Sequence, residues 1–301
     1  MKINYGMNLL HAAKRWIEPD IWGQHIGERW GLKHAQFCFD LLDPRATLDS
    51  RKEYADEVKK ASKKYGFEMH SCLTGSGTFW YTLLMNPFSE GRKDAWHWCE
   101  LAAETSKMLG AKGLGGPIAA ASLADYANPE RFNFLKEEFV KGMQYFSKSA
   151  ASQGQDFILF EPSNLGREGL IKIDEAKKLH EQLNKNTAIP VHFMLDVGHQ
   201  CGYEVSGKDS DPYAWLEELG QYSPIVHIQQ TNGKADCHWS FTKENNDKGI
   251  IKMDKVLEAL EKSGLKEVTI FPEFFYGTDF NDERILEEID ESWEYLKPFF
   301  N

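Results

Sequence analysis

The segment Phe193-Met194-Leu195-Asp196-Val197-Gly198-His199 is an apolar run that meets an acidic residue. Three further segments, in which an apolar run also meets an ionisable residue, are Phe157-Ile158-Leu159-Phe160-Glu161-Pro162, Val226-His227-Ile228-Gln229 and Ile270-Phe271-Pro272-Glu273. Short apolar runs bounded by polar residues, Gly or Pro are typical of strands buried in a parallel sheet. The four ionisable residues follow one another at intervals of 35, 31 and 46 residues, each close to the length of one strand–helix unit. The spacing therefore predicts parallel strands joined by crossover helices.

The same rhythm extends over the whole chain. Apolar runs alternate with amphipathic stretches, and we predict strands at residues 3–8, 34–40, 68–73, 112–118, 156–162, 191–197, 225–230 and 268–273. Tyr54, Val58, Ala61 and Tyr65 recur at helical spacing before Gly66, a residue type common at helix C-termini. Eight such units in 301 residues, without a low-complexity linker, fit a single-domain α/β fold, a (β/α)8 TIM barrel over residues 1–301. A doubly wound open sheet is the alternative, but no G-x-G-x-x-G turn follows the first strand.

Composition and charge argue against several classes of protein. Lys and Arg number 35 against 46 Asp and Glu, and the net charge of −11 argues against gripping nucleic acid through its phosphates. No stretch approaches the roughly 18–20 consecutive apolar residues of a membrane span. Five widely spaced cysteines without a C-x-x-C pair indicate reduced thiols, and residues 1–6 are strand-like, without a signal-peptide core. We therefore expect a cytoplasmic protein with no nucleic-acid or membrane partner.

The ionisable residues of the four quoted segments predict a metal site. Reactive groups of (β/α)8 barrels lie at the C-terminal ends of the strands, so Glu161, Asp196, His227 and Glu273 should converge. Three carboxylates buried around one point repel one another unless a cation lies between them. Together with one imidazole they suit one divalent ion such as Mn²⁺, Mg²⁺ or Co²⁺, with Zn²⁺ as a further candidate. The alternative is that each residue pairs separately with a Lys or Arg.

These segments resemble the xylose isomerase-like TIM barrels, and the resemblance covers essentially the whole chain. The Glu161-Pro162, Asp196-Val197-Gly198-His199, His227-Ile228-Gln229 and Pro272-Glu273 stretches are most similar to those of the ketose 3-epimerase branch. The resemblance implies that Glu161, Asp196, His227 and Glu273 hold one divalent metal ion. It also implies that Glu161 and Glu273 are the catalytic acid/base pair, and that His199 matches a histidine in contact with the substrate.

The reaction implied by this resemblance is epimerisation or isomerisation of a ketose or ketose phosphate by an isomerase of carbohydrate metabolism. The metal ion would stabilise an enediolate, while the two glutamates remove and return the proton. A metal-dependent lyase, a dehydratase or decarboxylase of a keto-sugar acid, would use the same residues and is the alternative. A non-enzymatic sugar-binding protein on a degenerate barrel is less favoured, because all four predicted ligands are present.

The loops after the strands carry further candidates for substrate binding. Arg167 lies in a Gly-flanked turn and is suited to bidentate binding of a phosphate or carboxylate, with an ion pair to Glu168 as the alternative. His70 is predicted to end the third strand. Trp80 follows in a loop that would screen the site from water, unless it packs against a neighbouring loop or subunit. A homo-oligomer is an expectation from the general habit of such barrels.

The loop after the predicted metal histidine departs from the epimerase pattern. The sugar epimerases usually carry an Arg six residues after that histidine, where this chain has Gly233 followed by Lys234. If Arg167, Lys234 and His238 converge, the substrate is a short sugar phosphate, and a tetrulose phosphate 3-epimerase is our specific hypothesis. For Lys234 and His238 the alternative is an ordinary surface loop.

A nuclease is the least favoured member of the superfamily. Asp236-x-His238 is similar to the extra zinc ligands of the abasic-site endonucleases. Those enzymes also need a histidine after strand four, where this chain has Gly115-Gly116-Pro117. The acidic net charge argues in the same direction.

Overall fold

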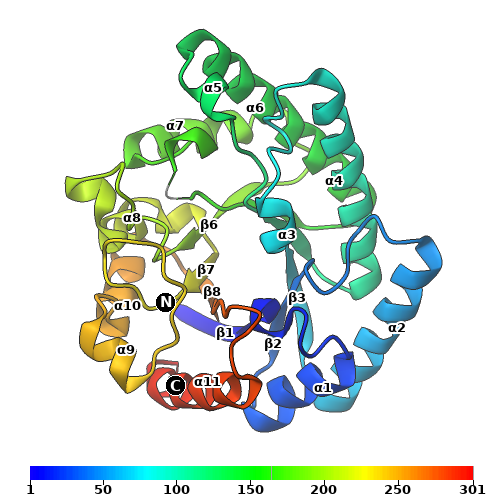
Figure 1. Ribbon diagram of the computed structural model, residues 1–301, viewed down its shortest axis with the longest axis vertical. Helices are drawn as coiled ribbons and strands as arrows, with labels where there is room; N and C mark the ends of the chain where they lie inside the picture. The colour runs from blue at the N-terminus through cyan, green and yellow to red at the C-terminus, as the bar shows by residue number, and fades with distance from the viewer. Residues whose placement is uncertain (164, 301) are drawn as a thin grey trace.

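The computed structural model of the protein describes residues 1–163 and 165–300, and in them eight parallel strands close into a barrel (Figure 1). The strands are β1 (Lys2–Asn8), β2 (His34–Cys38), β3 (Glu68–Leu73), β4 (Gly113–Gly116), β5 (Phe157–Phe160), β6 (Val191–Asp196), β7 (Ile225–Ile228) and β8 (Glu267–Pro272). Each strand pairs with the next, and β8 pairs with β1 through the register Lys2↔Glu267. This closure confirms the predicted TIM barrel and excludes the open sheet.

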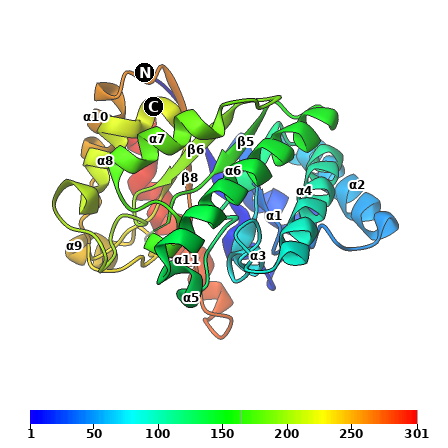
Figure 2. The ribbon, with the colours of Figure 1, turned by 90° about the horizontal axis from the view of Figure 1, so that it is seen from above.

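Helices cover the outside of the barrel (Figure 2). The helices of the structure are α1 (Pro19–Gln24), α2 (Leu48–Tyr65), α3 (Gly75–Phe79), α4 (Ser89–Leu109), α5 (Leu123–Tyr126), α6 (Pro129–Ser152), α7 (Ile173–Leu183), α8 (Pro212–Leu219), α9 (Lys243–Lys248), α10 (Met253–Lys262) and α11 (Asp282–Leu296), of which the short α3 lies at the mouth (Figure 1). Helix α2 shows how local sequence sets the ends of these elements. The Thr47 hydroxyl accepts a hydrogen bond from the Ser50 amide at the N-terminus, and Gly66 ends the helix at φ +72°.

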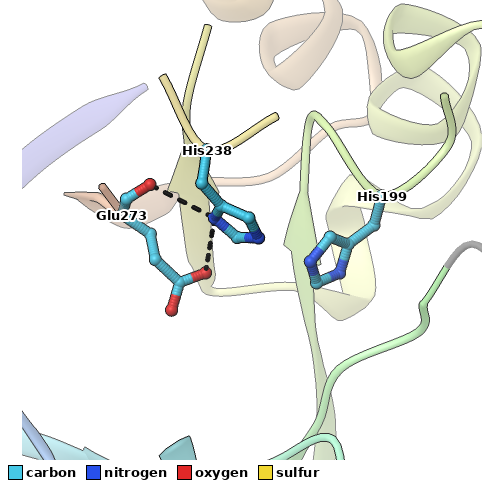
Figure 3. Close-up of side chains that lie close together, drawn as sticks. All are labelled: His199, His238 and Glu273. Atoms are coloured by element: carbon cyan, nitrogen blue, oxygen red, sulfur yellow. Dashed lines mark hydrogen bonds and ion pairs between the residues drawn. The ribbon is translucent and has the colours of Figure 1, made fainter. Parts of the chain in front are cut away.

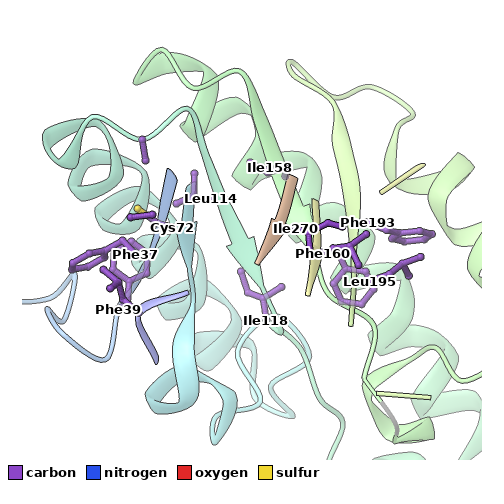
Figure 4. Close-up of a cluster of buried hydrophobic side chains, with 14 of the residues drawn as sticks. Phe37, Phe39, Cys72, Leu114, Ile118, Ile158, Phe160, Phe193, Leu195 and Ile270 are labelled. Atoms are coloured by element: carbon purple, nitrogen blue, oxygen red, sulfur yellow. The ribbon is translucent and has the colours of Figure 1, made fainter. Parts of the chain in front are cut away.

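The core has two layers. The larger one lies between strands and helices and includes Phe37, Phe160 and Phe193 (Figure 4). The smaller one fills the barrel interior with the side chains of Leu10, Cys38, Leu73, Leu159, Met194, Ile225 and Phe271. These side chains fill the interior below the C-terminal mouth, the end at which the reactive groups of such barrels lie. None of the described helices is long and apolar enough to cross a membrane.

Candidate metal centre and active site

The structure brings Glu161, Asp196, His227 and Glu273 together at the mouth of the barrel. Glu161 follows the last residue of β5, Asp196 ends β6, His227 is the third residue of β7, and Glu273 follows β8. All four side chains are buried, and one ligand atom from each lies within 4.8 Å of the others. We call these residues the quartet. The convergence expected from the strand ends is therefore present, and three carboxylates share one buried site.

His227 lies between two of these carboxylates. Its Nδ1 atom is 3.0 Å from Oε1 of Glu161 and 3.1 Å from Oε2 of Glu273. Burial alone would lower the pKa of the imidazole, but the Glu273 and Glu161 carboxylates raise it well above its usual value. Burial would likewise raise the pKa of Glu273, yet the neighbouring imidazoles, His227 first, hold it near 2. The site therefore favours positive charge at the point that the carboxylates and Nδ1 share.

Asp196 provides the test of whether this point suits a metal ion. Its Oδ1 atom accepts hydrogen bonds from the Gly198 amide at 2.6 Å and from Nε2 of Gln229 at 2.8 Å. Its Oδ2 atom is buried and has no hydrogen-bond partner among the described residues. Burial raises the pKa of this carboxyl to about 6. A carboxylate oxygen left without a partner is costly, and a divalent cation held by Glu161, Asp196, His227 and Glu273 would satisfy it.

Beside the quartet, two histidines converge on one carboxylate. Nε2 of His199 lies 3.4 Å and Nε2 of His238 lies 3.2 Å from Oδ2 of Asp236. The His199 ring is held by the carbonyl of Pro162, 3.1 Å from its Nδ1. Figure 3 shows the His238 ring between Glu273 and His199, with Nδ1 3.4 Å from the Glu273 carbonyl and 3.7 Å from its carboxylate. His238 has φ +47°, a conformation that favours glycine, so the surrounding contacts over-determine its position.

Gln229 joins this cluster to the quartet. Its Nε2 atom donates to Asp196 and, at 2.7 Å, to Oδ1 of Asp236, while its Oε1 accepts from the His238 amide. The Gln229 side chain lies so close to the backbone of Gly198 that a Cβ atom at that position would be 2.2 Å from Cδ of Gln229. Gly198 is therefore required by packing around the site, which explains the glycine within the Asp196–His199 segment.

A cavity of about 200 Å³ opens at this point. It is lined by Leu10, Leu73, Gly75, Ser76, Trp80, Pro117, Glu161, His199, Asp236, His238, Glu273 and Phe275. The lining thus combines acidic and imidazole groups with apolar side chains. Trp80 lies at the outer edge with 80% of its surface exposed. The volume suits a small polar molecule with one apolar face.

The family follows from comparison with known proteins. The model of the xylose isomerase-like TIM barrel family matches residues 27–298. The chain belongs to this family. D-erythrulose 1-phosphate 3-epimerase of Brucella abortus (strain 2308) is 27% identical over 303 residues, which cover 99% of this chain and 96% of that protein.

Solved structures of xylose isomerase-like barrels superpose on the whole chain. A protein of Rhodospirillum rubrum ATCC 11170, 27% identical, gives a TM-score of 0.91 and covers 98% of this chain and 99% of its own. D-psicose 3-epimerase from Clostridium cellulolyticum H10, solved with D-tagatose, is 16% identical, gives a TM-score of 0.74 and covers 99% of each chain. At this identity the second match shows the shared barrel.

Three residues predicted to contact the substrate, His70, Lys234 and Arg167, do not line the cavity. His70 does not end β3 but is its third residue, at a register shift opposite Ala35 and Gln36. Its ring packs against Phe157 and Phe271 and does not line the cavity, so the prediction that His70 ends the third strand is wrong. Lys234 is exposed, because hydrogen bonds from the Gly233 and Lys234 amides to Thr231 and Asn232 turn the loop outward.

Arg167 lies on the rim of the barrel in the loop after β5. Its carbonyl accepts a hydrogen bond from the Ala121 amide at 2.8 Å, and its side chain is half-buried beside Glu168. Burial raises the pKa of Glu168, against the opposing effects of Ser163 and Arg167. Of the three residues predicted to converge on an anionic group, His238 alone lines the cavity, and Arg167 remains a rim residue.

Sequence reasoning missed several polar residues of this family member's site. Asn8 ends β1 and Gln36 lies within β2, and Asp236 was considered only as part of a nuclease-like motif. Glu168 is buried near His199 and Asp236. For Asn8 the available signal was the one that found the quartet, because it is a polar residue at the C-terminal end of β1, whereas Gln36 lies in the middle of β2 and has no such signal.

Proposed function

We propose that this protein is a divalent-metal-dependent 3-epimerase of a short ketose phosphate, with erythrulose 1-phosphate as its substrate. The chain is an isomerase, the class of its epimerase relatives, and the substrate and metal dependence are what we propose. The observation that carries the proposal is the approach of Glu161 and Glu273 to the same nitrogen of His227, at 3.0 and 3.1 Å. These glutamates come from β5 and β8, which are separated in the barrel by β6 and β7.

Two separate carboxyl groups are what a 3-epimerisation needs. One glutamate takes the C3 proton, and the C–H electron pair moves toward the C2 carbonyl to give an enediolate. The other glutamate, in its protonated form, returns a proton to the opposite face of C3. A divalent cation bound by the quartet would stabilise the negative charge of that intermediate. Positioned acid–base groups of this kind contribute about 10²- to 10⁴-fold to the rate.

The small volume of the cavity supports a short substrate. At about 200 Å³ it is smaller than most drug-sized ligand sites, which range from about 300 to 1,000 Å³. His199 and His238 line the cavity with raised pKa values, and positive charge at this wall favours an anionic group such as a phosphate. The Brucella relative, whose name specifies D-erythrulose 1-phosphate, supports a four-carbon phosphate over a longer free sugar.

The test is isotope exchange at C3. Metal-stripped protein is mixed with D-erythrulose 1-phosphate in D2O, with and without Mn²⁺, and the C3 proton is followed by NMR. We expect Mn²⁺-dependent loss of the signal and appearance of the L epimer, both abolished in Glu273→Gln. Glu283→Gln, an exposed change in the first turn of α11, is the matched control and should exchange normally. A protein that binds Mn²⁺ tightly but exchanges no ketose would contradict the epimerase and favour the lyase.

A further inference from the structure

Two buried amides support the quartet from below. Asn8 and Gln36 are register partners on β1 and β2, and their exposures are 1% and 0%. Neither residue can bind a proton or carry charge at neutral pH. Their hydrogen bonds nevertheless reach His227 and Glu273, which lie on β7 and after β8.

The orientation of the Asn8 amide is fixed by the backbone. The Leu10 amide, which can only donate, lies 2.7 Å from Oδ1 of Asn8. Oδ1 is therefore the acceptor, and Nδ2 faces the other way. Nδ2 donates to Oε1 of Gln36 at 2.7 Å and to Oε1 of Glu273 at 3.2 Å.

The Gln36 amide is fixed in turn. The atom that accepts from Asn8 must be its carbonyl oxygen, and its Nε2 donates to Ser71 at 3.1 Å and to the Met194 sulfur at 3.3 Å. The same Oε1 lies 2.6 Å from Nε2 of His227. Because a carbonyl oxygen cannot donate, Nε2 of His227 must carry the hydrogen.

The consequence is that the other nitrogen, Nδ1, holds the lone pair of the neutral ring. Nδ1 is the atom that faces Glu161 and Glu273. We infer that Asn8 and Gln36 are positioning residues, which fix the proton of His227 on Nε2 and thereby present Nδ1 to the metal. The inference rests on the proposed metal dependence of the quartet. Outer hydrogen bonds of this kind typically change metal affinity by about 10- to 100-fold.

Three variants separate this role from packing. Gln36→Met removes the acceptor and keeps an unbranched side chain of similar length. Gln36→Glu keeps an oxygen acceptor opposite Nε2. Gln155→Met makes the same change at another buried glutamine, which bonds to Ser106 and does not contact the quartet. Each metal-free protein is titrated with Mn²⁺, and free Mn²⁺ is measured by electron paramagnetic resonance.

We expect Gln36→Met to weaken Mn²⁺ binding about 10- to 100-fold, whereas Gln36→Glu and Gln155→Met bind as wild type. Equal affinity of Gln36→Met and wild type would overturn the inference. Weak binding by the wild type would instead refute the proposed metal site.

A direct measurement on the wild type covers the case in which Gln36→Met fails to fold, as judged by circular dichroism. In protein labelled with ¹⁵N-histidine and loaded with Mg²⁺, the His227 signals are those lost in His227→Asn. We expect the proton on Nε2. A proton on Nδ1 in the loaded protein would exclude the inference.

Discussion

Nε2 of His199 lies 3.4 Å from Oδ2 of Asp236, although the two residues come from different barrel loops, after β6 and β7. The same oxygen holds His238 at 3.2 Å. Burial opposes protonation of both rings, but Asp236 and its acidic neighbours raise the pKa of His199 to about 9 and that of His238 to about 10. Asp236, together with the carboxylates of the quartet, thus favours the imidazolium form of both rings.

Replacing this carboxylate should weaken substrate binding more than metal binding. Asp236→Asn removes the charge that orients both rings but leaves the four residues of the quartet in place. We expect KM to rise about tenfold or more, the cost of losing one or more charge-assisted hydrogen bonds, with little change in Mn²⁺ affinity. Steady-state kinetics and Mn²⁺ titration check this. Lys234→Ala, in the exposed part of the same loop, is the control, and a matching rise in its KM would contradict the assignment.

Asp196→Asn should raise the stability of the metal-free protein and weaken its binding of Mn²⁺. The unpartnered Oδ2 atom costs stability in the metal-free protein, and an amide keeps an oxygen for the Gly198 N–H while removing one negative charge. We expect the metal-free variant to melt at a higher temperature than metal-free wild type, and Mn²⁺ binding to weaken by more than the roughly 100-fold upper range of an outer partner. Calorimetry with and without Mn²⁺ measures both effects. A lower melting temperature in the metal-free state would show that Oδ2 carries no such cost.

The quartet could be found in the sequence because one rule places it. Apolar runs locate the strand ends and the barrel brings these ends together, so Glu161, Asp196 and Glu273 could be predicted without knowledge of the loops. Loop residues follow local hydrogen bonding instead. Lys234 turns outward through bonds to Asn232 that the sequence does not display as a pattern.

The prediction that His70 ends the third strand was wrong for a different reason. The apolar run around it gives the strand correctly but not the position of each side chain along the barrel axis, and the register shift at this point adds a residue to β3. His70 is the third of the six residues of this strand, so the rule that places strand-end residues in the site does not apply to it.

The corrected position of His70 leads to a prediction about pH. Burial first, and then the nearby His34 and Lys112, lower the pKa of His70 to about 4, below the ordinary value near 6.5. The unfolded chain therefore binds more protons than the folded one between these values, so stability falls as the pH drops from about 6.5 toward 4. At pH 5 this single group removes on the order of 2 kcal/mol.

His70→Gln should remove that contribution and leave substrate binding unchanged. We expect the loss of stability between pH 7.5 and pH 5 to be smaller in the variant, as measured by urea unfolding of both metal-free proteins. KM at pH 7.5 should match wild type, because the ring packs against Phe157 and Phe271 and does not line the cavity. A raised KM would restore His70 to the substrate site, and an unchanged pH dependence would assign the proton uptake to other groups.

A substitution at Arg167 tests whether the enzyme recognises a phosphate. Its side chain is half-buried on the rim, in a loop held to the next one by the Gly166 amide and Oε2 of Glu204, 3.0 Å apart. We expect a guanidinium here to bind a phosphate that projects from the cavity, a group that an unphosphorylated tetrulose lacks. Arg167→Ala should therefore raise KM for erythrulose 1-phosphate by about tenfold to a hundredfold, as expected for hydrogen bonds to a charged group, and leave exchange of free erythrulose unaffected. Parallel C3-proton exchange with both substrates measures the ratio. Equal effects on the two would mean that Arg167 supports the loop through its neighbours, and the phosphate would then have to be recognised by His199 and His238 in the cavity wall.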